Sequence, residues 1–132
     1  MPKKDVEGRK PHILLVEDDV FLADIYQKKF DMEGYKVTLA DNGEKALVEA
    51  KKKKPDIILL DILLPKLDGF AVLSELKKDP TTSSVPVILL TNLGQKDDVE
   101  KGLEMGAVDY LIKAHFKPSE IVDKIKSVLV KA

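Results

Sequence analysis

Short aliphatic runs alternate along the chain with longer stretches in which apolar residues recur every three or four positions. The clearest run, residues 57–60, consists of aliphatic residues only and is bracketed by Pro55 and a turn from Pro65 to Gly69. Such a run is too short for a helix and does not alternate with polar residues, so it predicts a strand buried on both faces of a parallel sheet. Five strands are predicted in this way, at residues 12–16, 35–40, 57–60, 85–90 and 107–112.

The stretches between these runs predict helices with one apolar face. In the first of them, five large apolar residues recur at helical spacing, and we expect all five to face the core: Phe21, Leu22, Ile25, Tyr26 and Phe30. Residues that cap or end helices indicate the boundaries. Helices are predicted between Asp19 and Gly34, between Asn42 and Pro55, between Asp68 and Pro80, from about Gln95 to Met105, and from Pro118 onward.

Strands that alternate with helices specify an α/β fold, a doubly wound parallel sheet with helices on both faces. We expect one domain over residues 12–131, preceded by a flexible N-terminal tail at residues 1–11 that is rich in Lys, Arg, Pro and Gly. The helix at 95–105 is interrupted by Gly102 and has few apolar residues. We therefore expect it to be the least stable of the helices.

Composition narrows the classes of function. The chain of 132 residues has 22 Lys and Arg against 23 Asp and Glu, so its charge suggests neither a nucleic-acid partner nor a membrane surface. The absence of cysteine excludes disulfides, thiol catalysis and thiolate metal sites. There is no signal-peptide pattern and no apolar run of about 18 residues, so we expect a soluble cytoplasmic protein.

A run of four lysines, Lys51 to Lys54, closes the second predicted helix. Positive charge is favoured at a helix C-terminus by the helix dipole, and we prefer this explanation. An anion-binding patch is the alternative that the run leaves open.

Polar side chains follow the predicted strands. Glu17 and Asp18 come after the first strand, Asp61 after the third, Thr91 after the fourth and Lys113 after the fifth. Ligands of open parallel sheets bind beyond these carboxyl ends, so we expect the five side chains to meet. Carboxylates at close range repel one another unless a cation neutralises them, and oxygen ligands without His or Cys favour Mg²⁺. Asp61 then has the position of a carboxylate nucleophile for phosphorus, with Lys113 neutralising the phosphoryl oxygens.

Four motifs carry a resemblance to a known family. They are Leu-Val-Glu17-Asp18-Asp19, Asp61-x-x-x-Pro65-x-x-Asp68-Gly69, Leu-Leu-Thr91, and Gly106-Ala107-x-Asp109-Tyr110-Leu-x-Lys113. Each is weak alone, but in this order they make residues 12–131 resemble a response-regulator receiver domain of two-component signalling, of the chemotaxis-receiver kind. The resemblance implies a five-stranded sheet in the flavodoxin-like order 2-1-3-4-5.

The resemblance also implies a magnesium site. Asp18, Asp61 and the backbone carbonyl of Leu63 would be direct ligands, and Glu17 would act directly or through water. Alignment on the preceding aliphatic strand makes Glu17 and Asp18 the family's acidic pair and leaves Asp19 as a helix cap.

Phosphate chemistry is implied in the same way. Asp61 would accept a phosphoryl group from a histidine kinase or a histidine phosphotransfer protein. Thr91 would bond a phosphate oxygen, Lys113 would pair with the phosphate, and Tyr110 would be the aromatic residue of a switch. The chain would catalyse only its own phosphorylation and dephosphorylation.

The expected partners follow from that role. We expect a stand-alone receiver whose fourth helix, fifth strand and fifth helix form a face that changes shape and binds a downstream effector protein. We expect no direct contact with nucleic acid or membrane, and a monomer or a weak dimer on phosphorylation.

The sequence leaves alternatives open for one peptide bond and for the function. Ala114 follows Lys113 where the family has proline after a cis bond, so this peptide bond could be cis or trans. An interaction module that is never phosphorylated, an aspartyl-phosphate hydrolase and a flavodoxin-like cofactor protein remain competing functions. The hydrolase pattern has a second acid two residues after its nucleophile, where this chain has Leu63.

Overall fold

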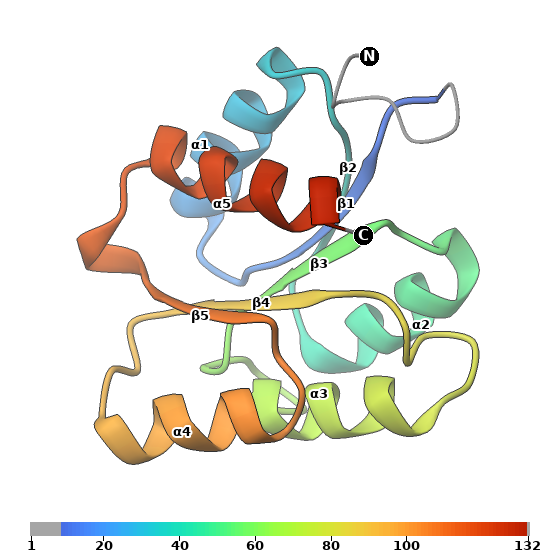
Figure 1. Cartoon of the computed structure of the whole chain (residues 1–132), viewed down its shortest axis with the longest axis vertical. Helices are drawn as coiled ribbons and strands as arrows, with labels where there is room; N and C mark the ends of the chain where they lie inside the picture. Colours follow the sequence, from blue (N-terminus) through green and yellow to red (C-terminus); the bar gives the residue numbers. More distant parts are fainter. Residues whose placement is uncertain (1–8, 132) are drawn as a thin grey trace.

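The computed structural model describes residues 9–131, so residues 1–8 of the expected tail lie outside the described part. Five parallel strands form one sheet in the order β2-β1-β3-β4-β5, which confirms the predicted fold and strand order (Figure 1). The strands are β1 His12–Val16, β2 Lys36–Ala40, β3 Ile57–Leu60, β4 Val87–Thr91 and β5 Asp109–Ile112. The helices are α1 Val20–Met32, α2 Gly43–Lys53, α3 Gly69–Lys78, α4 Lys96–Glu104 and α5 Pro118–Lys131, with a short 3-10 helix, η1, at Lys113–His115.

Helices cover both faces of the sheet. Figure 1 shows α1 and α5 on one face and α2, α3 and α4 on the other. Strands β1, β3 and β4 are buried along their whole length because of this double cover. One apolar cluster, including Leu73 and Leu89, lies on the α2–α3 face, and a second, including Phe30 and Ile125, lies on the α1–α5 face. No helix within residues 9–131 is both long enough and apolar enough to cross a membrane.

Three predicted helix starts are confirmed by side-chain caps. Asp19, Asn42 and Asp68 each accept a hydrogen bond from the backbone amide three residues later, at 2.9–3.1 Å. These bonds satisfy amides that the first turn of a helix leaves unpaired. Asp19 therefore acts as the cap of α1, as expected.

The predicted core face of α1 is partly wrong. Phe21 is 83% exposed and Ile25 is 48% exposed, whereas Ala23, Tyr26 and Phe30 are buried. Each residue advances a helix by about 100°, so Phe21 and Ile25 lie on a side roughly opposite to Ala23. Helical spacing alone fits both sides, and only packing on the sheet selects the buried one.

Several boundaries differ from those expected. Strand β2 begins at Lys36 and β4 at Val87, one and two residues later than expected, and β5 begins only at Asp109. Thr91 is the last residue of β4 rather than the residue after it. Lys113 does not close β5 but begins the 3-10 helix η1.

Helix α4 has fewer buried residues than the other four α-helices. Of its nine residues, Gly102 alone is buried. A Cβ added at Gly102 would lie 2.5 Å from Cδ1 of Leu89 and 3.1 Å from a ring carbon of Tyr110. The glycine that was expected to weaken the helix is thus also the residue that lets the helix approach the sheet. Its low stability remains a prediction.

Gly69, the first residue of α3, lies against the backbone that follows β3. A Cβ at this position would lie 2.3 Å from the carbonyl oxygen of Asp61 and 2.5 Å from Cα of Ile62. Backbone atoms cannot rotate away, so we expect Gly69→Ala to lower the free energy of unfolding by about 2–3 kcal/mol. Gly94→Ala is the matched control, because its nearest neighbour is the mobile end of Ile112 at 3.2 Å. Urea denaturation would measure both, and equal stabilities would contradict the expectation.

Candidate functional site

Three carboxylates meet at the carboxyl edge of the sheet. Glu17 and Asp18 follow β1, and Asp61 follows the neighbouring strand β3. One oxygen from each of them lies within 4.8 Å of the others. Glu17 and Asp61 are buried, whereas Asp18 is exposed. The structure therefore brings together the acidic residues that the sequence pointed to, with an open side at Asp18.

Lys113 binds two of these carboxylates. Its Nζ lies 2.5 Å from Oδ2 of Asp61 and 2.6 Å from Oε1 of Glu17, and its side chain is only 8% exposed. The contact with Glu17 was not predicted, because sequence reasoning paired Lys113 with a phosphate. It arises because the backbone of Lys113 directly follows β5, whereas its long side chain reaches past β4 to the carboxylates that follow β3 and β1.

The charges at this site do not balance. Three carboxylates and one ammonium leave two negative charges. Burial raises the pKa of Glu17, and Lys113 only partly opposes this rise. Burial alone would lower the pKa of Lys113, but hydrogen bonds to Asp61 and Glu17 outweigh it and raise that pKa. The charged form of Lys113 is thus stabilised by two acids, whereas the three acids together have only one positive charge beside them.

A divalent cation would neutralise the two negative charges that remain. The oxygen-only set suits a hard ion such as Mg²⁺ better than a soft one. The amide of Asp19 donates to Oε2 of Glu17, and that of Leu63 donates to Oδ1 of Asp61, each at 3.1 Å. These bonds orient both buried carboxylates. The expected role of the Leu63 carbonyl as a ligand remains a prediction.

Thr91 and Tyr110 lie on the β4–β5 side of the site. Thr91 is fully buried, and its Oγ1 accepts a hydrogen bond of 3.3 Å from the amide of Leu93. The Tyr110 hydroxyl donates to the carbonyl of the same residue, Leu93. Burial, with the nearby carboxylates of Asp98 and Asp61, raises the pKa of Tyr110 to about 12. Both side chains therefore bind one loop, 92–95, which leads into α4.

The peptide bond between Lys113 and Ala114 is trans, as are the other peptide bonds in residues 9–131. This answers the alternative that the missing proline left open.

Comparison with known proteins gives a consistent picture. The sequence profile of the family described as "Response regulator receiver domain" matches residues 13–126. The "Probable transcriptional regulator ycf27" of Porphyra purpurea is 42% identical over 127 residues, which cover 96% of this chain and 51% of that protein. The "DNA-binding dual master transcriptional regulator RpaA" of Synechocystis sp. is 40% identical over 119 residues, covering 90% of this chain and 49% of that protein. A putative response regulator of Chloroflexus aurantiacus has a similar structure, with a TM-score of 0.84, 36% identity, and coverage of 92% and 99%.

These relatives correct two expectations. The chain spans about half the length of the curated relatives it matches, so the expectation of a stand-alone receiver has no support from them. The expectation that nucleic acid has no place among the partners is wrong, because a relative matched over 90% of this chain is named as DNA-binding. Balanced net charge was a poor guide, since it describes this chain and not the longer proteins in which such chains occur.

Proposed function

Because the chain belongs to the response regulator receiver domain family of two-component signalling, we propose that Asp61 accepts a phosphoryl group from a phosphohistidine of a histidine kinase or a histidine phosphotransfer protein. One observation carries the proposal. Asp61 is a buried carboxylate at the end of a central strand, held by Lys113 and adjacent to two further carboxylates. An ion pair needs one acid for each base, whereas here Lys113 contacts two buried acids and an oxygen of a third acid, Asp18, lies within 4.8 Å of them.

The transfer is a single displacement. A carboxylate oxygen of Asp61 attacks phosphorus, the phosphorus–nitrogen bond breaks, and the electron pair leaves with the imidazole. Glu17, Asp18 and Asp61, with the backbone carbonyl of Leu63, would hold Mg²⁺, which neutralises the phosphoryl oxygens when bound. Lys113 would keep its contact with Glu17 and exchange its contact with Asp61 for one with a phosphoryl oxygen.

The response would begin at Thr91. A phosphoryl oxygen near Asp61 would accept a hydrogen bond from the Thr91 hydroxyl, which would then release the amide of Leu93. Tyr110, bonded to the same residue, would change position with the loop. Helix α4 has few buried contacts, so the face formed by α4, β5 and α5 would change shape.

Thr91→Ala is expected to separate labelling from this response. Wild type should gain the mass of one phosphoryl group from acetyl phosphate and Mg²⁺, and amide exchange in 93–105 should change severalfold. The variant should gain the same mass, because Asp61 is intact, while its change in exchange falls by more than half. Mass spectrometry measures both quantities.

Thr91→Ser, which retains the hydroxyl, is the matched control and should respond like wild type. A wild type that gains no mass would favour an interaction module that is never phosphorylated. An equal exchange response in the alanine variant would remove Thr91 from the switch.

We extend the proposal to the output. The relative from Synechocystis sp. is DNA-binding, so the altered face would act on a DNA-binding element, whether in the same polypeptide or in a partner. The chain's catalysis would be confined to its own phosphorylation and dephosphorylation, in the cytoplasm. A hydrolase of free metabolites is disfavoured, because the exposed side chain of Leu63 stands where such enzymes carry their second acid.

A further inference from the structure

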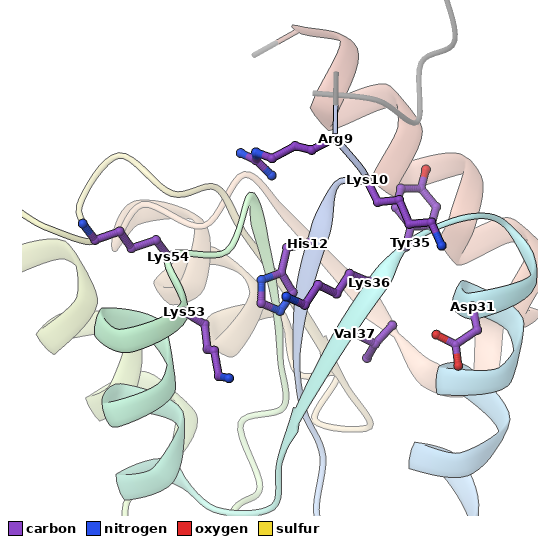
Figure 2. A pocket seen from close by; sticks show the side chains of 9 residues that line it. All are labelled: Arg9, Lys10, His12, Asp31, Tyr35, Lys36, Val37, Lys53 and Lys54. Carbon is purple, nitrogen blue, oxygen red and sulfur yellow. The ribbon is translucent and has the colours of Figure 1, made fainter. Parts of the chain in front are cut away.

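A hollow of about 770 Å³ lies beside the amino ends of β1 and β2, at the edge of the sheet opposite Asp61. We call it the basic hollow and define it by its lining residues: Arg9, Lys10, His12, Asp31, Tyr35, Lys36, Val37, Lys53 and Lys54. Figure 2 shows His12 and Lys36 near its centre, with Lys53 and Lys54 on the α2 side and Asp31 on the α1 side. The proposed phosphorylation uses none of these residues.

Positive charge dominates the basic hollow. Five of its lining residues are Lys or Arg, and Asp31 is the single acid among them. Arg9 is committed to Asp56 by two hydrogen bonds of 2.8 and 2.9 Å. By contrast, the four lysines make no ion pair with any residue in the described range 9–131, whereas lysines elsewhere pair with neighbouring acids. Within residues 9–131, the basic hollow therefore holds four ammonium groups without an ion-paired acid.

Neutralising the dipole of α2 does not explain this arrangement. That explanation applies to Lys53 and Lys54 at the end of α2, but Lys36 belongs to β2 and Lys10 precedes β1. Lysines from three separate segments thus line the same concave surface. Mutual repulsion disfavours such a cluster unless an anion reduces it.

His12 supplies a polar group within the basic hollow. It is 6% exposed, and its Nε2 lies 2.7 Å from Oγ1 of Thr38. Its backbone amide donates to the carboxylate of Asp56 at 2.7 Å, and the same carboxylate accepts hydrogen bonds from Arg9. Burial, together with the charge of Lys36, lowers the pKa of His12. The imidazole is thus fixed beside the lysines, where it can report a ligand that enters the basic hollow.

We propose that the basic hollow binds a small phosphate-bearing anion of the size of a nucleoside diphosphate. The volume lies within the range of ordinary small-ligand sites. A site with several lysines suits an anion that carries more than one negative charge. Lysine binds phosphate as a point charge, whereas the planar fork that matches a carboxylate belongs to arginine. Nucleic acid is a poorer fit, because its phosphates follow an extended backbone whereas these lysines surround a concavity.

The chain contains two histidines, which makes the test selective. In NMR spectra of the whole protein, pyrophosphate and ADP should each shift the imidazole signals of His12 at millimolar concentration. His115, in η1 at the other end of the sheet, should not move. Tighter binding of ADP than of pyrophosphate would show that the nucleoside contributes, and equal binding would show that the phosphates suffice.

Lys36→Gln combined with Lys53→Gln should weaken binding about tenfold, since each exposed charge contributes modestly. Lys52→Gln is the matched control, because Lys52 precedes Lys53 in the same helix but does not line the basic hollow. It should leave the affinity within twofold.

Four results would overturn the proposal: no shift of His12, an equal loss of affinity with Lys52→Gln, citrate bound as tightly as pyrophosphate, or a DNA duplex bound through the same lysines more tightly than ADP. None of them bears on Asp61, so this proposal and the proposed phosphorylation fail independently.

Discussion

Replacing Asp61 with Asn is expected to abolish labelling by acetyl phosphate and Mg²⁺. The amide has the shape of the carboxylate but neither its negative charge nor its nucleophilic oxygen, so no acyl phosphate can form. The variant should fold, because its side-chain oxygen can still accept from the amide of Leu63 and Lys113 keeps Glu17. Intact-protein mass spectrometry after incubation with the phosphodonor measures the loss, and circular dichroism measures the fold.

Asp19→Asn is the matched control for this result. Asp19 is adjacent to the acidic set in sequence, yet its side chain caps α1, and Asn caps helices as well as Asp does. Labelling of this variant should match wild type. Undiminished labelling of Asp61→Asn would place the acceptor elsewhere, and loss of labelling in Asp19→Asn would make Asp19 part of the chemistry.

Lys113→Met is expected to destabilise the metal-free protein by about 3–5 kcal/mol, because it leaves two buried carboxylates without their ammonium. It should also slow labelling, since no cation then pairs with the transferred phosphoryl group. Urea denaturation in the presence of EDTA gives the free energy of unfolding. Added Mg²⁺ should stabilise this variant by binding the folded state alone.

The pH dependence of the Lys113→Met variant gives a second readout. Burial raises the pKa of Glu17 above the unfolded value near 4.5, and loss of Lys113 removes the group that opposes this rise. A raised pKa means that the folded state binds more protons, so the deficit relative to wild type should shrink as pH falls toward 4.5 and grow as pH rises.

Lys124→Met controls for the loss of a surface lysine. The side chain of Lys124 is 44% exposed, and its Nζ lies 4.0 Å from Oδ2 of Asp109, which makes a long and weak ion pair. The substitution should change stability by less than about 0.5 kcal/mol. A Lys113→Met variant as stable as wild type in EDTA would show that the buried acids do not need the ammonium.

The sheet and the acidic set could be predicted because they depend on local patterns. Strand β1 was predicted with its observed bounds, since an aliphatic run that stops at Glu17 leaves little freedom. Parallel strands then bring residues at their carboxyl ends together whatever the intervening loops do, so the approach of Asp61 to Glu17 followed from topology.

Other contacts depend on packing that no local pattern records. The buried side of α1 was misassigned because Phe21 and Ile25 have the same spacing as residues that pack on the sheet. The bond from Tyr110 to the carbonyl of Leu93 depends on the path of a loop. The helix dipole of α2 accounts for Lys53 in the sequence alone. That Lys53 and Lys36 line the same hollow becomes visible only when α2 lies beside β2 in the fold.

Gly69 gives the site one stiff side. The first turn of α3 touches the main chain of Asp61 and Ile62 so closely that not even a methyl group fits between them. On the other side, α4 rests on the sheet through one buried glycine. If phosphorylation of Asp61 displaces the surrounding chain, we therefore expect the displacement to go toward α4 and not toward α3, because unequal compliance of the two sides would give it a direction.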